Sequence, residues 1–129
     1  MINEDTGKVI YKELSYKIVG ILFEVYNDLG YGYKEKYYEK ALMVALKEQK
    51  IQFKTQVPFI LKFKEKIIGR NYLDFLIEDK IVLEIKKGKH FSKNNLDQVK
   101  QYLKITNLKL AILANFTPDG IKYIRVLNA

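Results

Sequence analysis

The chain has 129 residues, of which 48% are apolar, and it contains no cysteine. This length predicts one domain over residues 1–129, and the missing cysteine excludes disulfides, thiolate metal sites and cysteine nucleophiles. No apolar run reaches the roughly 18 residues that a membrane span requires. The polar and acidic start of the chain, with Glu4 and Asp5, does not resemble a secretory signal. We therefore expect a soluble, cytoplasmic protein with no membrane partner.

Basic residues outnumber acidic residues by 23 to 15, which gives a formal net charge of +8. A small basic domain is attracted to polyanions, of which nucleic acid is the commonest in a cell. Almost all of the positive charge is lysine, with Arg70 and Arg125 as the two arginines. Lysine enrichment can also reflect thermal adaptation, so charge alone leaves both interpretations open.

The first third of the chain has the apolar spacing of helices. A first helix is predicted over about residues 9–29, and Gly30 is suited to end it because glycine adopts left-handed conformations cheaply. A turn at residues 31–33 leads to a second helix over about residues 34–49. The predicted inward residues are Leu14, Ile18, Ile21, Leu22, Val25 and Leu29 in the first helix, and Tyr38, Ala41, Leu42, Ala45 and Leu46 in the second.

Alternating patterns then indicate strands in an antiparallel meander. The predicted strands are residues 51–57 with 59–63, then 67–77, then 81–86, with turns at 64–66 and 78–80.

A polar loop over residues 87–93 leads to a helix at about 94–105, and an apolar run at 108–114 predicts a strand buried on both faces. A turn at 118–120 precedes a last strand at 121–126. The order α-α-β-β-β-α-β-β predicts an α/β (α+β) fold, with a mixed sheet flanked by helices and one parallel crossover.

Three charged side chains, Asp74, Glu84 and Lys86, lie in otherwise apolar strands. Burying an unpaired charge is unfavourable, so these residues need a compensating interaction. Glu84 and Lys86 are two residues apart and share a face of their strand. A three-residue turn at 78–80 would place Asp74 opposite Glu84, whereas a two- or four-residue turn would place it on the other face. We predict the three-residue turn.

Two facing carboxylates repel each other unless a cation lies between them, and oxygen-rich sites suit Mg²⁺ or Mn²⁺. A neighbouring lysine can stabilise charge on a phosphate or help to position a water molecule. The alternative is an ordinary cross-strand set of salt bridges on a solvated face. The spacing alone favours this second interpretation.

The arrangement of Asp74, nine intervening residues and Glu84-Ile85-Lys86 resembles the signature of the PD-(D/E)XK nuclease superfamily. The topology around it, with a helix, a meander carrying the motif, and then helix and strand, is also similar. Leu73 stands at a position that is often proline in that superfamily.

The segment Gly32-Tyr33-Lys34-Glu35-Lys36-Tyr37-Tyr38 is similar to the pattern that names the GxxExxY protein family, a small branch of this superfamily. The resemblance runs from about Ser15 to Val126 and includes residues 98–104 and 113–116. It implies a restriction-endonuclease-like core and a Mg²⁺- or Mn²⁺-dependent nuclease that acts on nucleic acid, with DNA expected.

The resemblance also implies roles for individual residues. Asp74, Glu84 and Glu35 would be catalytic acidic residues that bind the metal, together with the backbone carbonyl of Ile85, and Lys86 would orient or activate the water. Glu35 could instead only complement the dipole of its helix.

Further residues would support the site or contact nucleic acid. Gln98 and Tyr102 share one helical face and resemble a Gln-x-x-x-Tyr element of related nucleases, although an ordinary amphipathic helix has the same spacing. Lys87 and Lys89 could bind phosphates or belong to a solvated loop. Arg70 is placed on the face of Asp74 by counting alternate residues along the strand.

Two alternatives to catalysis stay open at this point. One is a nucleic-acid-binding module without activity, and the other is a homodimeric interaction module on the same fold. A purely binding protein has no need of buried carboxylates that face phosphate, so the three charged residues favour an enzyme.

Overall fold

The computed structural model describes residues 10–90 and 92–129. Its elements follow the predicted order α-α-β-β-β-α-β-β, and residue 9, where the first helix was predicted to begin, lies outside the described residues. In chain order they are α1 (Lys12–Leu29), α2 (Glu35–Glu48), β1 (Phe53–Phe63), β2 (Lys66–Ile77), β3 (Ile81–Lys87), α3 (Lys93–Thr106), β4 (Leu110–Thr117) and β5 (Gly120–Leu127).

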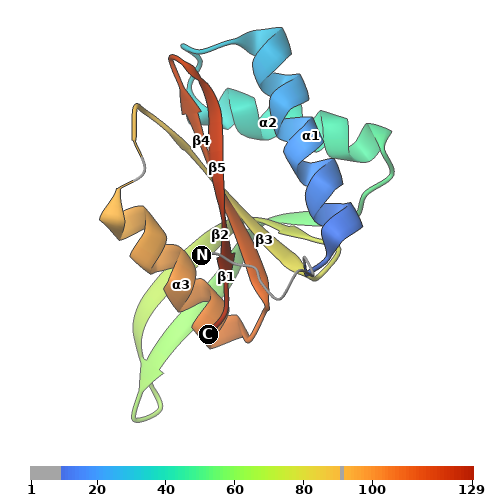
Figure 1. Ribbon diagram of the computed structural model, residues 1–129. Coiled ribbons are helices and arrows are strands. Elements are labelled where there is room, and N and C mark those ends of the chain that lie inside the picture. Colours follow the sequence, from blue (N-terminus) through green and yellow to red (C-terminus); the bar gives the residue numbers. More distant parts are fainter. Residues whose placement is uncertain (1–9, 91) are drawn as a thin grey trace.

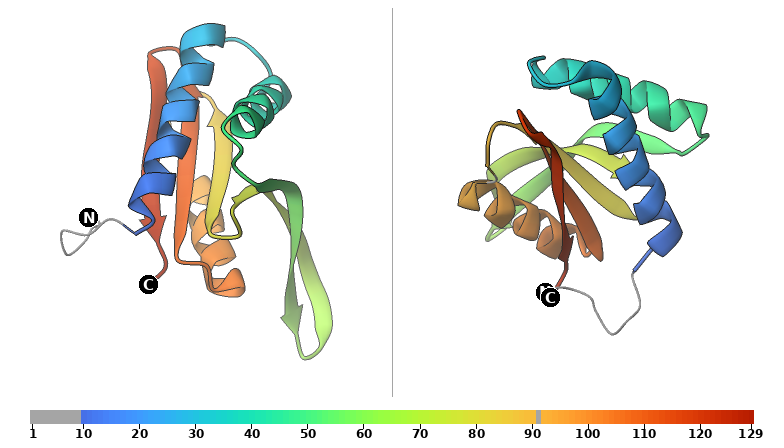
Figure 2. Two further views of the ribbon diagram at one scale, coloured as in Figure 1. Left: turned by 90° about the vertical axis from the view of Figure 1, so that its right-hand side faces the viewer. Right: turned by 45° about the horizontal axis from the view of Figure 1, so that its top comes forward.

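The five strands form one mixed sheet in the order β1-β2-β3-β4-β5. β3 and β4 pair in parallel, and the other neighbouring pairs are antiparallel. The helices α1 and α2 cover one face of the sheet, and α3, which connects β3 to β4, covers the other (Figures 1 and 2). The predicted mixed sheet and parallel crossover are therefore confirmed.

Each face of the sheet has its own apolar core. Alternate residues of β3 and β4, such as Leu83 and Ile112, pack against α1 and α2. The intervening residues, such as Val82 and Leu113, pack against Val99 and Leu103 of α3. All eight residues of β4 are buried, which confirms the prediction that the apolar run would be covered on both faces.

Gly30 ends α1, as predicted, with φ 72° and ψ −166°. This backbone conformation is available essentially to glycine alone. Within the described residues, no helix has both the length and the apolar character that crossing a membrane requires.

The β1–β2 hairpin is longer and more continuous than predicted. The two segments 51–57 and 59–63 form one strand that runs through Pro58, which is tolerated because β1 is an edge strand of the sheet. Lys64 and Glu65 both have positive φ and form a two-residue turn, so the predicted three-residue turn at 64–66 is wrong. The end of this hairpin, residues 60–72 and hereafter the arm, projects from the rest of the molecule (Figure 2).

Candidate active site

The turn between β2 and β3 sets the position of Asp74. Ile77 pairs with Ile81 and Phe75 pairs with Leu83, so the intervening turn has three residues, as predicted. Two of its residues have positive φ, and the Lys80 N–H donates a 2.9 Å hydrogen bond to the Ile77 carbonyl. This register brings Asp74 level with Glu84.

Past the Phe75–Leu83 pair, side-chain carboxyl groups take the place of backbone carbonyls in the hydrogen bonds between β2 and β3. The Asp74 N–H donates to Glu84 Oε1 at 2.7 Å, and the Ile85 N–H donates to Asp74 Oδ2 at 2.9 Å. Each carboxyl group thus accepts a hydrogen bond from the backbone of the other strand. This reciprocal exchange fixes Asp74 and Glu84 side by side at the point where β2 and β3 separate.

β2 is also irregular on its other side at this point. Gln56 would face Asp74 in the β1–β2 register, but the pair is missing from the ladder, and Gln56 has a φ of 50°. Leu73 and Leu76, three residues apart, both pack in the core beneath α3, so the alternation of faces is interrupted between them. Asp74 therefore occupies a break in the sheet.

The segment Gly32–Tyr38 brings Glu35 to the same region. The Tyr38 hydroxyl donates to the Gly30 carbonyl at 2.6 Å and accepts from the Tyr33 N–H at 3.3 Å, while its ring stacks on Phe116. This anchor fixes the connection between α1 and α2. Glu35, the first residue of α2, accepts a hydrogen bond from the Lys87 N–H at 3.0 Å, so its carboxylate contacts the end of β3 in addition to any interaction with the helix dipole.

Burial dominates the electrostatics of the two central carboxyl groups. Burial, and then the charge of Asp74, raises the pKa of Glu84 to about 8. Burial likewise raises the pKa of Asp74, against the opposing effects of the Ile85 N–H and the charge of Lys86. A hydrogen bond between the two carboxyl groups favours the proton on Glu84, so the pair shares one proton when no cation is bound.

The salt-bridge alternative does not fit this arrangement. Glu84 has an exposed fraction of only 3%, so it does not lie on a solvated face. Within the described residues, the sole ion pair joins Lys54 to Asp79 at the turn, and Lys86 makes no direct ion pair with either carboxylate. A buried and a half-buried carboxyl group that lie side by side without a direct cationic partner among the described residues require another explanation.

The remaining predicted residues differ in their distance from the carboxyl pair. Tyr102 is buried in α3, and its phenol has a raised pKa because of burial and the charges of Glu84 and Asp74. Gln98 is half-buried one turn earlier on α3. Lys87 follows Lys86, with its ammonium 5.3 Å from the Tyr31 ring centre, and Lys89 is exposed.

Arg70 is not brought to the carboxyl pair. It is exposed in the arm, where it pairs with Ile60. Counting alternate residues placed it on the face of Asp74, but that count fails because the alternation is interrupted next to Asp74.

The sequence analysis missed two residues in this region. Glu39 lies one helical turn after Glu35, and its pKa is raised by partial burial and then by the charges of Asp74 and Glu35. The spacing of four from Glu35 could have identified it. Asn115 lies beside Lys86 in the β3–β4 ladder, is 1% exposed, and has no hydrogen-bond partner for its amide in the described part of the chain. A polar residue inside the apolar β4 run was the available signal.

The donor set is compatible with a hard divalent cation. Asp74, Glu84 and Glu35 offer carboxylate oxygens, which Mg²⁺ and Mn²⁺ prefer. Among residues 10–90 and 92–129, no three such side chains already converge as a metal-binding cluster. The carboxyl groups of Asp74 and Glu84 are instead held by the backbone N–H groups of Ile85 and Asp74.

Comparisons with known proteins show the family and the fold of the chain. The family model described as "PD-(D/E)XK nuclease superfamily" matches residues 12–126. The crystal structure of SSO0001 has a similar fold, with a TM-score of 0.55 and 23% identity over 92% of this chain. The chain spans only 58% of that protein. A comparison with curated proteins gave no match. The family match covers nearly the whole chain, which therefore belongs to the PD-(D/E)XK nuclease superfamily.

Proposed function

We propose that the chain is a divalent-metal-dependent nuclease that hydrolyses phosphodiester bonds in DNA. The observation that carries this proposal is the carboxyl pair of Asp74 and Glu84, in which each carboxyl group accepts a hydrogen bond from the backbone of the other strand. Lys86 follows Glu84 by two residues on the same strand. Glu84 is buried and Asp74 is half-buried, and burial raises the pKa of both carboxyl groups, so a cation between them would relieve their repulsion. Membership of the nuclease superfamily supports the same activity.

Asp74, Glu84 and Glu35 would hold the metal ion, together with the backbone carbonyl of Ile85. When bound, Mg²⁺ or Mn²⁺ would supply positive charge that polarises the phosphate and lowers the pKa of a water molecule. The Ile85 N–H bond to Asp74 and the Lys87 N–H bond to Glu35 would orient the two carboxylates on either side of Lys86.

Lys86 would orient the attacking water and stabilise the negative charge that develops on the phosphate. The water oxygen would form a bond to phosphorus in line with the leaving oxygen, and the bond from phosphorus to that oxygen would break. The attacking water would lose a proton to solvent, and the leaving oxygen would take one up from solvent. Lys86 lies on the face of β3 that carries Glu84, and its charge lowers the pKa of both Asp74 and Glu84. This electrostatic coupling supports a shared role for the three residues.

Several residues around the carboxyl pair would bind the substrate backbone. Lys87 and Lys89 lie at the end of β3 and follow Lys86 directly, where phosphate contacts would position the strand without reading its sequence. Tyr102 and Gln98 would support the site from α3. Arg70 lies in the arm, away from the carboxyl pair, and has no role in this proposal. The net charge of +8 favours such binding.

The experiment compares Mg²⁺-dependent cleavage of single- and double-stranded DNA by the unchanged chain and by Asp74→Ala and Lys86→Ala. Losing a metal ligand or a charge-stabilising group should lower the rate on the order of 100-fold or more. Asp79→Ala and Lys80→Ala are matched controls, because both residues are exposed at the neighbouring turn. Cleavage that survives equally in Asp74→Ala and Lys86→Ala would refute the assignment.

A nucleic-acid-binding module without catalysis is the second candidate, and the net charge of +8 favours it. Such a module would bind DNA in EDTA with a strong salt dependence and would not cleave it when Mg²⁺ is added. Membership of the GxxExxY branch, a homodimer and a cytoplasmic location are further predictions from the sequence.

A further inference from the structure

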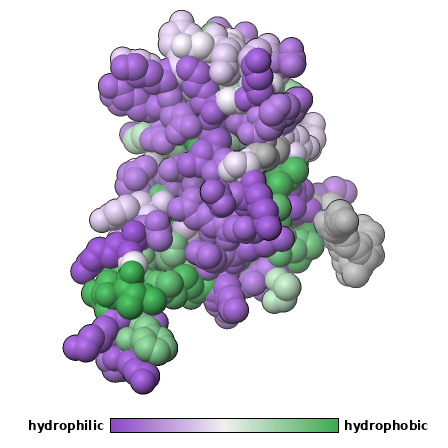
Figure 3. Space-filling model, turned by 90° about the vertical axis from the view of Figure 1, so that its left-hand side faces the viewer, coloured by the Kyte–Doolittle hydropathy of each residue, from purple (hydrophilic) through white to green (hydrophobic). Residues whose placement is uncertain are grey.

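The arm exposes large apolar side chains to solvent. Six large apolar residues of the arm have exposed fractions between 38% and 62%: Ile60, Leu61, Phe63, Ile67, Ile68 and Tyr72. In Figure 3 hydrophobic residues gather at the lower left, where the hairpin projects, with hydrophilic residues beyond them. Contiguous exposed apolar patches, especially on hairpins with an open edge, are typical of protein-contact surfaces.

The arm is also basic, which restricts its partner. Residues 60–72 contain Lys62, Lys64, Lys66 and Arg70 against a single acidic residue, Glu65. Four of the six exposed apolar residues are aliphatic, whereas proteins that bind single strands present aromatic faces for base stacking. Contact between two arms would bring like charges together. An apolar surface that carries acidic groups is the complementary partner.

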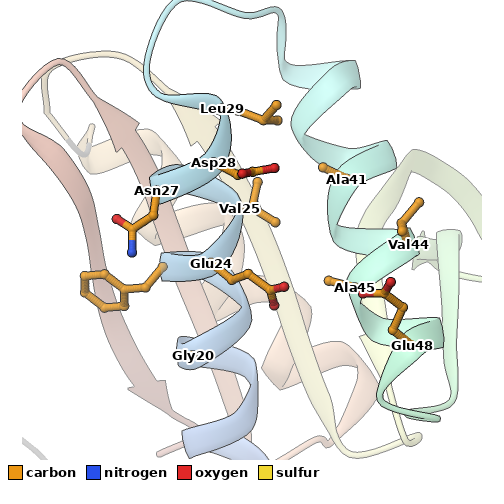
Figure 4. Close-up of a pocket in the computed structure, with 11 residues that line it drawn as sticks. Gly20, Glu24, Val25, Asn27, Asp28, Leu29, Ala41, Val44, Ala45 and Glu48 are labelled. Atoms are coloured by element: carbon orange, nitrogen blue, oxygen red, sulfur yellow. The ribbon is translucent and has the colours of Figure 1, made fainter.

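The structure contains such a surface on the same chain. A groove of about 930 Å³ lies between α1 and α2, and Figure 4 shows Glu24 and Glu48 directed into it from opposite helices. Asp28 adds a third carboxylate, and no lysine or arginine lines this groove among the described residues. Exposed Phe23 and Val44 supply apolar surface, and small residues such as Gly20, Ala41 and Ala45 keep the groove open.

We propose that the arm of one copy of this chain binds the α1–α2 groove of a second copy. Aliphatic residues on one face of the arm would cover Phe23 and Val44, while the arm lysines would face Glu24, Asp28 and Glu48. Contact would bury apolar surface on both sides and neutralise an acidic patch with a basic one. Neither surface includes Asp74, Glu84 or Lys86, so this self-association is independent of the proposed nuclease chemistry.

The two surfaces belong to different parts of the molecule, because the arm projects at the end opposite the α1–α2 connection (Figure 1). Each arm–groove contact therefore joins two different surfaces. It gives a two-fold pair when both arms are exchanged, and a ring or an open chain when they are not.

Light scattering during size-exclusion chromatography, at low ionic strength, tests the proposal with the full chain. The unchanged protein should exceed the monomer mass of 15.2 kDa. The double substitution Lys64→Glu with Lys66→Glu reverses the charge of the arm. The double substitution Glu24→Lys with Glu48→Lys reverses the charge of the groove. Each reversal alone should give a monomer. Lys12→Glu with Lys17→Glu is the matched control, because both residues are exposed at the start of α1 outside the two surfaces, and it should leave the mass unchanged.

An equimolar mixture of the arm-reversed and groove-reversed chains should regain the larger mass, because each altered surface then meets an oppositely charged one. This rescue requires both variants to be folded, so it separates lost contact from lost structure. A monomeric unchanged protein would overturn the proposal, as would a groove reversal that still associates, which would indicate contact between arms. The proposal would also be overturned if the arm-reversed chain bound DNA more weakly but kept the mass of the unchanged protein.

Discussion

Replacing Glu84 by glutamine removes the charge of the central carboxyl group and keeps its shape. Burial and the charge of Asp74 raise the pKa of Glu84 from 4.5 to about 8 in the folded protein. The folded protein therefore holds a proton that the unfolded chain releases near pH 4.5. The stabilisation from this proton is complete below about pH 4.5 and is lost as the pH rises through 8, so the free energy of unfolding should fall over this interval.

The size of the loss follows from the separation between the two pKa values. At about 1.4 kcal/mol for each tenfold difference in proton affinity, the interval from 4.5 to about 8 corresponds to an upper bound of roughly 5 kcal/mol. Asp74 titrates together with Glu84, so the loss belongs to the pair. Glutamine can accept the hydrogen bond from the Asp74 N–H and can donate from its own amide to the Asp74 carboxylate, as protonated Glu84 does.

Urea unfolding at several pH values between 5 and 8, in EDTA, measures this difference. Glu84→Gln should match the unchanged protein near pH 5 and exceed its stability by several kcal/mol near pH 8, within the roughly 5 kcal/mol bound. Glu13→Gln, at an exposed position in the first turn of α1, is the control and should follow the unchanged protein throughout. If the advantage of Glu84→Gln does not grow with pH, the carboxyl pair does not hold a proton in the folded state and the reasoning is refuted.

Two further substitutions test contacts that position the site. Tyr38→Phe removes the hydrogen bonds to the Gly30 carbonyl and from the Tyr33 N–H but keeps the ring stacked on Phe116. The free energy of unfolding should therefore fall by about 1 kcal/mol. Unchanged stability in urea would show that the hydroxyl does not anchor the α1–α2 connection. Asn115→Leu removes a buried amide that has no partner in the described residues, and because such a group costs roughly 1–3 kcal/mol, the variant should be at least as stable in thermal unfolding. A clear loss of stability would show that the Asn115 amide has a partner in solution.

The fold was predictable where local pattern and burial agree. The apolar run in the fourth strand predicted burial on both faces, and all of β4 is buried. Gly30 was predicted to end the first helix, and its backbone conformation requires glycine. The order of elements also followed from periodicity, because each change from helical to alternating spacing lies within about two residues of a real boundary.

Features that depend on position in the sheet were not predictable in the same way. Pro58 separates two alternating segments in the sequence, and only the edge position of β1 allows one strand to continue through it. Lys64 and Glu65 both have positive φ, although neither residue type favours that conformation. The start of α3 at Lys93, capped by the Ser92 hydroxyl at 3.0 Å from the Asn95 N–H, was placed one residue late.

The candidate site was predictable to the extent that register could be counted. Asp74, Glu84 and Lys86 were chosen because they are charged residues in apolar strands, and the three-residue turn then placed Asp74 level with Glu84. The prediction that Arg70 shares the face of Asp74 was wrong, because it assumed that side chains alternate regularly between the two faces of β2 up to Asp74. Asn115 was missed because an isolated amide in a buried strand has no periodic pattern to mark it.

The irregularity at Asp74 also explains how a folded sheet can hold two carboxyl groups together without a direct ion pair. In a regular antiparallel ladder, the N–H groups of Asp74 and Ile85 would not be available to side chains. Here they donate to Glu84 and Asp74, so the backbone that separates the strands also orients the carboxyl groups. Removing either side chain entirely would leave a backbone N–H without its partner. Glutamine at Glu84 is therefore the more informative change, because alanine would combine a structural defect with the loss of charge.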